Sequence, residues 1–245
     1  LPAIRAEDFP SDILIHLRFP MSHFIPDFID FFKDLAGNNN RDWFNANKKR
    51  YEQSVKNPFN LFVQHMLDEM MKRDKRYAEM KAKDCVFRIY RDVRFGKNKD
   101  PYKLQMGAII APGGRKGMGG EPGMYLEFTP EHLRIYSGVY MPEKDTLQKI
   151  REHIISDPKG LEKAVNGKDF KKNFGEIRGE KNKRLPSKDM MTAAAENPII
   201  FNKQFYFYAE LKPDELLNKD FSAKLFKIYD TSEEVRDYLT KASGK

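Results

Sequence analysis

The sequence predicts an α+β protein in which an antiparallel sheet of about five strands packs with N-terminal and C-terminal helices. Apolar residues recur at three- and four-residue steps in the first third of the chain, and the period changes to two from Cys85 onward. The predicted strands follow one another through short connections, as in an antiparallel meander. With 245 residues and 40% hydrophobic residues, the chain can bury a substantial core.

Three helices are predicted before the sheet. Residues 24–36 carry Phe, Ile and Leu at helical spacing, and Gly37 follows as a C-cap. The Asn run 38–40 offers an N-cap for a second helix, in which aromatic residues recur as far as Val55. Pro58 begins a third helix that continues to about residue 73. We interpret the aromatic stripe of these helices as core.

The strands come next in the chain. Residues 85–95 alternate, with Phe87, Ile89, Val93 and Phe95 on one face, and residues 102–110 form a second strand. Two more strands, MYLEFT and LRIYSGVY, flank a short turn. A helix is predicted over 142–155, short helices and exposed connections over 158–189, a last strand within IIFNKQFYFYAEL, and terminal helices over 221–240.

The composition of the chain limits the cellular compartment and the kinds of partner that we expect for the protein. Lys and Arg number 44 against 36 for Asp and Glu, a net charge of +8 that supports solubility or a general attraction to polyanions. No stretch approaches the roughly 18 apolar residues of a membrane span. The lone Cys85 excludes an internal disulfide and suits a reducing compartment. We therefore expect a cytoplasmic protein without a membrane partner.

The predicted domain covers residues 21–245, because no linker is long or biased enough to demand two domains. Residues 1–20 lack an initiator Met and the basic segment of a secretory signal. We expect them to lie outside the fold, as a non-native or extended N-terminal segment.

The most informative stretch is RIYRDVRFGKNKDPYK, residues 88–103. Alternation places Arg88, Tyr90, Asp92 and Arg94 on one face of the predicted strand, where two guanidinium groups could clamp a phosphate or a carboxylate. Asp92 could orient the arginines or act as a base, and it is the candidate catalytic residue. The alternative is a cross-strand ladder of ion pairs in which Glu127 or another acid neutralises the row.

The turn after this strand adds cations to the same patch. Gly96 permits a sharp turn and Pro101 fixes its exit, so that Lys97, Lys99 and Lys103 can bend back over the arginines. Tyr102 supplies a hydroxyl or a stacking face. The predicted ligand-binding residues are Arg88, Tyr90, Arg91, Arg94, Lys97, Lys99, Tyr102 and Lys103.

Other motifs are weaker. The glycine-rich loop 112–120 joins two strands and lacks the Gly-Lys-Ser/Thr of a phosphate-binding loop, so it is interpreted as a hairpin tip, although Arg115 could belong to a cationic lid. The His residues show no metal-ligand spacing, and we predict no metal and no cofactor. Cys85 is interpreted as a small buried residue. Residues 168–188 are rich in Lys and Arg with Phe170 and Phe174 between them, which favours a solvated surface over a nucleic-acid contact.

Four stretches of the chain resemble, in order, a bacterial family called domain of unknown function 2461: NNNRDWFNANKKRYE, FRIYRDVRFGKNKDPYK, APGGRKGMGGEPGMYLEF and SGVYMPEKDTLQKIRE. The resemblance runs from about Phe24 to beyond Arg151 and weakens towards the C-terminus. It implies an intracellular, mostly bacterial protein and carries no established reaction, substrate or cofactor. Through its motifs it also points to Asn40, Arg41 and Trp43.

The sequence thus predicts a protein that binds a phosphorylated or carboxylated small molecule in a cationic pocket on the sheet, as a transferase or hydrolase or without catalysis. Arg88 and Arg94 would hold the anion and Asp92 would hold the arginines. Two alternatives stay open. One is a nucleic-acid-binding module that uses this patch and residues 168–188. The other is an interaction protein in which the arginine row is internal scaffolding.

Overall fold

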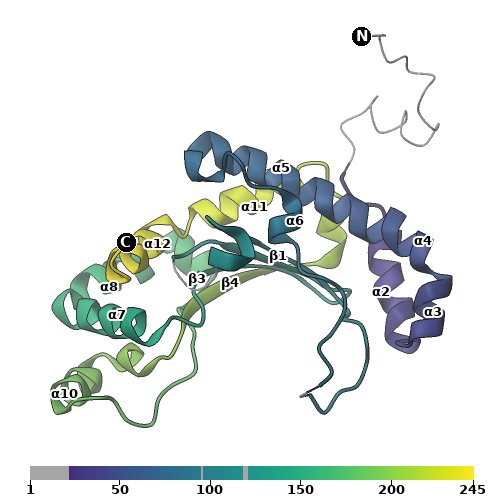
Figure 1. Ribbon diagram of the computed structural model, residues 1–245. Helices are drawn as coiled ribbons and strands as arrows, with labels where there is room; N and C mark the ends of the chain where they lie inside the picture. Colours follow the sequence, from purple (N-terminus) through teal and green to yellow (C-terminus); the bar gives the residue numbers. More distant parts are fainter. Residues whose placement is uncertain (1–21, 95, 118–120) are drawn as a thin grey trace.

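A sheet of four antiparallel strands forms the centre of the protein, and helices cover one of its faces (Figure 1). The computed structural model describes residues 22–94, 96–117 and 121–245. The strands lie side by side in chain order: β1 (Met106–Ile110), β2 (Met124–Phe128), β3 (Leu133–Val139) and β4 (Phe205–Leu211). This confirms the predicted α+β class and the antiparallel meander. The expected extra segment 1–20 and Phe95 lie outside the described residues.

The helices before the sheet are α2 (Asp27–Gly37), α3 (Arg41–Ala46), α4 (Lys48–Arg50), the π-helix η2 (Tyr51–Lys56), α5 (Asn57–Arg73) and α6 (Ala82–Cys85). The predicted apolar stripe of the first helix is confirmed, since Phe28, Phe31 and Leu35 are fully buried. Asn40 caps α3 as predicted, because its side-chain oxygen accepts a hydrogen bond from the backbone N–H of Trp43 at 3.0 Å.

The second and third predicted helices are joined differently from the prediction. The chain leaves the α-helical bonding pattern at Asn47 and then runs from η2 into α5 without a break. Pro58 therefore lies in the first turn of α5, directly behind the π-helical turn, instead of opening a separate helix. A proline donates no backbone hydrogen bond, and the wider π-helical turn accommodates that missing donor.

The covered face of the sheet packs on an aromatic core. Phe128 of β2 lies with its ring centroid 5.5 Å from that of Phe59 in α5 and 5.5 Å from that of Phe221. Phe207 of β4 meets Phe170 and Phe174, at 5.0 and 4.9 Å between centroids. All six rings are at most 2% exposed, so the interior joins both ends of the chain into one packed layer.

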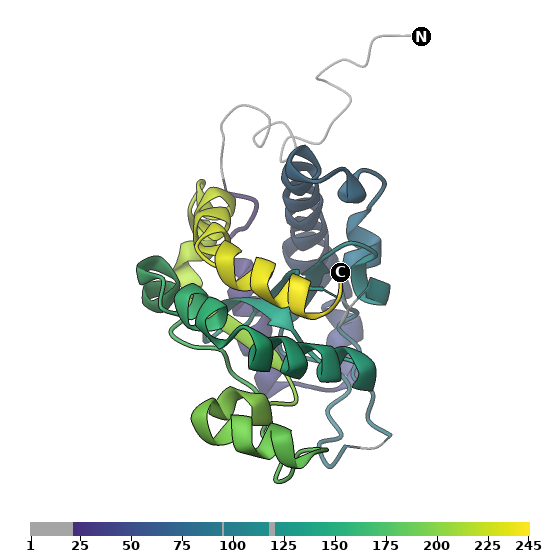
Figure 2. The same cartoon turned by 90° about the vertical axis from the view of Figure 1, so that its left-hand side faces the viewer.

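The remaining helices follow β3 and β4. They are α7 (Lys144–Ser156), α8 (Pro158–Val165), α9 (Lys168–Asn173), α10 (Lys188–Glu196), α11 (Phe221–Asp230) and α12 (Glu233–Ala242). The view in Figure 2 shows α12 beside α7, and α12 also packs against α8 and β3. Within the described ranges, no helix is long and apolar enough to cross a membrane.

The strand predicted over 85–95 is not a strand of this sheet. Cys85 ends the short helix α6, and the chain touches the sheet through a single bridge from Val86 to Ala108. It then pairs with its own return arm, where the N–H of Lys103 donates to the carbonyl of Ile89 at 2.8 Å. Like charges face each other across this arm, and Pro101 lacks a donor, so a regular ladder does not extend. Residues 86–94 and 96–105 form the two arms of an irregular hairpin, which we call the basic hairpin.

Candidate functional site

The arginine row of the basic hairpin is exposed, and one of its members is paired locally. The guanidinium of Arg94 donates from Nε to Oδ1 of Asp92 at 3.0 Å and from Nη2 to Oδ2 at 2.7 Å. These bonds, with a backbone N–H of Arg94 and the charge of Arg88, hold the pKa of the Asp92 carboxyl below its usual range. The Asp92 carboxylate therefore orients the Arg94 guanidinium, while the role of this pair at a ligand stays a prediction.

A second group of cations gathers at the base of the hairpin. Lys103 is half-buried, and burial lowers the pKa of its ammonium, as do the charges of Arg88 and Arg91. Its Nζ lies 5.7 Å from the ring centroid of Phe87 and makes no hydrogen bond or ion pair with any residue that the structure describes. Lys99 instead donates to the carbonyl of Val93 at 2.9 Å and closes the tip, while Lys97 is exposed. Thus Lys103, Arg88 and Arg91 form one positive group.

The two predicted tyrosines have different surroundings. Tyr102 is 3% exposed and stacks on Phe44 at 4.0 Å between ring centroids. Asn39 fixes its backbone with two hydrogen bonds, one from the N–H of Tyr102 at 3.1 Å and one to its carbonyl at 3.0 Å. Tyr90 is 51% exposed. The first tyrosine therefore anchors the hairpin to α3, and the second faces solvent.

The three residues that the family resemblance adds, Asn40, Arg41 and Trp43, lie in or beside α3, near this anchor. Asn40 caps α3, and the half-buried Trp43 packs on Phe31 with 5.6 Å between ring centroids. Arg41 is exposed. Burial and the neighbouring Tyr90 raise the pKa of the Tyr102 hydroxyl, and the charge of Arg41 lowers it. Arg115, in the short helix η4 (Gly114–Gly117), donates to the carbonyl of Val86. Of these side chains, Arg115 contacts the hairpin directly, whereas Asn40 and Trp43 belong to the α3 region to which Tyr102 is anchored. The predicted loop residues 118–120 lie outside the described part of the chain.

The face of the sheet opposite the helices carries a row of tyrosines. Tyr125, Tyr136, Tyr206 and Tyr208 are half-buried and alternate along β2, β3 and β4 with buried residues. The strand register places Tyr136 opposite both Tyr125 and Tyr208. We call this surface the open face. In both views the basic hairpin and the segment around α10 extend to its side of the sheet (Figures 1 and 2).

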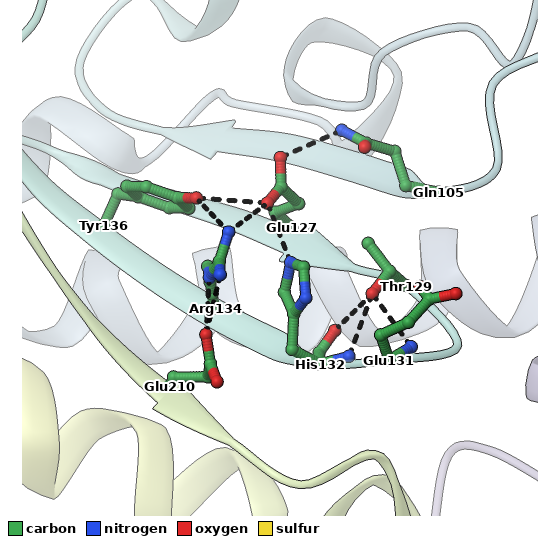
Figure 3. Close-up of polar contacts among 8 residues, drawn as sticks. All are labelled: Gln105, Glu127, Thr129, Glu131, His132, Arg134, Tyr136 and Glu210. Atoms are coloured by element: carbon green, nitrogen blue, oxygen red, sulfur yellow. Dashed lines mark hydrogen bonds and ion pairs between the residues drawn. The ribbon is translucent and has the colours of Figure 1, made fainter.

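Glu127 is the centre of a polar network on the open face (Figure 3). Its Oε1 accepts hydrogen bonds from the Tyr136 hydroxyl at 3.1 Å and from Nε2 of His132 at 3.2 Å. Gln105 donates to the other oxygen at 3.1 Å, and Nη1 of Arg134 lies 3.7 Å from Oε1. Arg134 pairs at the same time with Glu210 at 2.8 Å. The network fixes the direction of the Tyr136 hydroxyl, and the Arg134 guanidinium balances the negative charges of Glu127 and Glu210.

A cavity of about 450 Å³ lies on the open face beside this network. Its wall includes Lys103, Glu121, Glu127 and the rings of Phe87, Tyr125, Tyr136, Tyr140 and Tyr206. Gly138 belongs to the wall and has a φ of +110°, and a Cβ there would meet the carbonyl oxygen of Phe205 at 2.2 Å. The glycine is therefore required by the backbone, and it leaves the floor of the cavity free of a side chain.

The model of a protein family described as a conserved hypothetical protein, DUF2461, matches residues 27–238. The chain belongs to the DUF2461 family. The match covers all four strands and the cavity, and it continues past Arg151, where the resemblance in the sequence weakens. Among curated proteins no match was found.

Two of the predicted residues of this DUF2461 protein reach the cavity wall. Lys103 enters from the basic hairpin and Glu127 from β2. Asp92 and Arg94 pair with each other and are not part of that wall. Cys85 is fully buried, as predicted, and burial raises the pKa of its thiol to about 11, which makes it a poor nucleophile.

The tyrosine row is what sequence reasoning missed in this family member. Its signal was present, because Tyr206 and Tyr208 alternate with Phe205 and Phe207, and Tyr125 and Tyr136 occupy the matching positions of their strands. Alternation alone does not say that the rings of neighbouring strands meet, since that depends on register. The high density of Lys and Arg in residues 88–103 favoured a site on that segment, whereas the tyrosine row lies on β2, β3 and β4.

Proposed function

We propose that this DUF2461 protein binds a small molecule that combines a flat ring with a phosphate or a carboxylate, in the cavity on the open face. The cavity volume of about 450 Å³ falls within the range of small-molecule sites. Its aromatic wall suits the faces of a ring, and the tyrosine hydroxyls suit the polar groups on its edge.

The observation that carries the proposal is the Lys103 ammonium on the cavity wall. Both carboxylates of the wall have cationic partners, because Glu121 pairs with Arg76 at 2.9 Å and Glu127 lies beside Arg134. Lys103 has the neighbouring charges of Arg88 and Arg91 instead. An anion that arrives at Lys103 relieves this repulsion and gains from partial burial, where charge pairing is stronger than in water.

A thermal-shift screen tests the proposal. The probes are pairs of ring compounds with and without an anionic group, such as nucleosides with their monophosphates and aromatic amides with their carboxylates. We expect the anionic member to raise the melting temperature and the neutral member to raise it less, because a ligand that binds the folded state stabilises it by mass action.

Lys103→Met is the test variant, since methionine keeps the apolar stem and removes the charge. Lys97→Met is its matched control, because Lys97 is an exposed cation of the same hairpin that is not part of the cavity wall. We expect the shift to disappear in the first variant and to persist in the second. An anionic compound that stabilises Lys103→Met as well as the wild type would contradict the proposal, as would a screen without any shift.

A transferase or hydrolase step, the catalytic part of the prediction, would need a carboxylate at the cavity as general base. Of the two carboxylates on the cavity wall, Glu121 is held in a direct ion pair with Arg76 at 2.9 Å, whereas Glu127 lies 3.7 Å from Arg134 and is therefore the candidate base. Asp92 is exposed and paired with Arg94. The test is Glu127→Gln with a phosphate or carboxylate ester of a ligand found in the screen. Loss of turnover with retained binding would support a catalytic Glu127, and unchanged turnover would exclude it.

A further inference from the structure

Basic segments are attached to both edges of the sheet. At the edge of β1, the basic hairpin joins through the Val86–Ala108 bridge and a hydrogen bond from the N–H of Phe87 to the carbonyl of Gly107 at 2.9 Å. At the edge of β4, Arg178 exchanges two backbone hydrogen bonds with Tyr206, at 2.6 and 3.1 Å. A further bridge joins Lys181 to Asn202. The open face therefore continues on both sides into backbone that carries cations.

The charge of the protein is concentrated on these two rims. Residues 88–103 hold six Lys and Arg against two Asp, and residues 178–188 hold five Lys and Arg against one Glu. Each segment thus has an excess of four positive charges, and together they equal the +8 of the whole chain. Lys181, Lys183, Arg184 and Lys188 are exposed at the second rim. An extended polyanion could contact both rims, which lie on opposite edges of one surface.

A continuous series of contacts between aromatic rings, ending at a guanidinium group, connects the two rims. The ring centroid of Phe87 lies 6.0 Å from that of Tyr125, which lies 5.6 Å from Tyr136. Tyr136 is 5.0 Å from Tyr208, and the guanidinium carbon of Arg178 stands 4.3 Å from the Tyr208 ring. A side branch leads through Tyr206, 6.3 Å from Tyr136, to Tyr140, which is 48% exposed.

We propose that the open face binds single-stranded nucleic acid, with bases on the row of rings and phosphates on the two rims. Rings that stack unpaired bases beside cations that follow the backbone are the two elements of single-strand recognition. A duplex would offer its phosphates and keep its bases inside, so the tyrosines would have no partner. The carboxylates of the open face oppose this binding weakly, because Glu127 and Glu210 both lie beside Arg134.

This inference deepens the proposed function and rests on it in one respect, that one nucleotide of the strand would occupy the small-molecule cavity. The rim formed by 178–188 reaches beyond that cavity, whose wall it does not join. Phe170 and Phe174, the aromatic residues that precede this rim, are buried against Phe207 and take no part in it.

Fluorescence anisotropy with labelled oligonucleotides of about 16 nucleotides tests the inference. The probes are one DNA sequence as single strand and as duplex, the same sequence as single-stranded RNA, and a sulfated polysaccharide as competitor. We expect the single strands to bind at least about tenfold more tightly than the duplex, and their affinity to fall steeply with salt. Equal affinity for the duplex, or full competition by the polysaccharide at equal charge, would overturn the inference.

Variants distinguish the contribution of the rim charges to binding from that of the tyrosine rings. Lys181→Gln/Lys183→Gln/Arg184→Gln removes three rim charges and should weaken single-strand binding about tenfold or more at low salt. Its control, Lys219→Gln/Lys227→Gln/Lys241→Gln, removes three exposed charges from the segment of helices α11 and α12 and should leave binding unchanged. Tyr206→Ala should lose about tenfold or more while Tyr206→Phe, which keeps the ring, should not.

The thermal-shift assay with small molecules distinguishes a failure of the single-strand inference from a failure of the proposed function. If anionic ring compounds stabilise the wild type and the rim variant equally while no oligonucleotide binds, the single-strand inference is wrong and the proposed function stands. If oligonucleotides bind but the Tyr206→Ala and Tyr206→Phe variants bind equally, stacking on the open face is excluded and the inference is wrong. Circular dichroism of each variant confirms that its fold is intact.

Discussion

The two faces of the sheet are built from alternate residues of the same strands, and both carry large rings. On the covered face Phe128, Ile135 and Phe207 are fully buried under helices. On the open face Tyr136 and Tyr206 are half-buried; the Tyr136 hydroxyl donates a hydrogen bond to Glu127, and Tyr206 lines the cavity. The covered face thus uses its rings to exclude water, while the open face keeps aromatic surface where a ligand can reach it.

This difference indicates which substitutions should change stability and which should change binding. A ring packed on all sides contributes through burial and dispersion contacts that no other group replaces. A ring with a free face contributes less to folding and retains surface for an incoming partner. The predictions below use pairs of substitutions, one on each side of the comparison where the chain offers it.

Phe207→Ala on the covered face should have the largest effect. It opens a cavity beside Phe170 and Phe174, and we expect the free energy of unfolding to fall by about 3–5 kcal/mol. Its neighbour on the open face, Tyr206→Ala, should cost about 1 kcal/mol, because that residue is partly exposed and lines the cavity. Urea unfolding measures both. Equal losses would mean that the open face is as tightly packed as the core.

Gly138→Ala should come next. The added Cβ would meet the Phe205 carbonyl oxygen at 2.2 Å, at a φ of +110° that other residues rarely adopt, so we expect a loss of about 1–3 kcal/mol. Gly37→Ala is the matched control, because nothing lies within 4 Å of its new Cβ and the position ends a helix. Thermal unfolding should show the first variant destabilised and the second unchanged or slightly stabilised. A stable Gly138→Ala would show that the strand can relax.

The covered face was predictable from sequence, and the open face was predictable only in part. The period of three and four predicted Phe28 and Phe31 in the core, and the period of two predicted β2, β3 and β4. Local pattern fails at the basic hairpin, where alternation suggests a strand but like charges and Pro101 prevent a ladder. The cavity depends on register and on how far the hairpin folds back, and both are non-local.

The polar network around Glu127 on the open face can be tested through the Tyr136 hydroxyl. Burial raises the pKa of Tyr136 to about 12, a hydrogen bond from Arg134 lowers it, and the charge of Glu127 raises it. Glu127→Gln should therefore bring the pKa of Tyr136 down towards its usual value of 10.0. Phenolate absorbance during an alkaline titration measures the change, and Tyr136→Phe identifies the transition. Glu152→Gln, an exposed acid of α7, is the control and should leave it unchanged.

The raised pKa of Tyr136 also predicts how the free energy of unfolding changes at alkaline pH. The folded state keeps the Tyr136 proton up to about 12, whereas the unfolded chain releases it near 10.0. The unfolded state therefore binds fewer protons in that window, and the free energy of unfolding falls as the pH rises through it. In Tyr136→Phe this part of the fall should be absent. An unchanged alkaline slope would show that Tyr136 ionises alike in both states.

The smallest expected effect lies on the covered side, at a pair of histidines beside the core. His23 packs edge-on against Phe62, with 5.4 Å between ring centroids, and 5.1 Å from His65. His23 is exposed as a whole residue, but the partial desolvation of its ring beside Phe62 lowers its pKa below 6.5, and the charge of His65 lowers it further. The unfolded chain takes up this proton first as the pH falls, so the free energy of unfolding should decrease below a pH of about 6.5.

Urea unfolding at pH values from about 7.5 to about 5.5 measures this decrease. His23→Gln should flatten the part of the slope that belongs to His23, and His65→Gln should reduce it less, because burial is the larger cause. Acid would then weaken the covered side and alkali the open side of the same sheet. If the slope is the same in wild type and His23→Gln, the pKa of His23 does not differ between the folded and unfolded states, and the predicted loss of stability in acid is wrong.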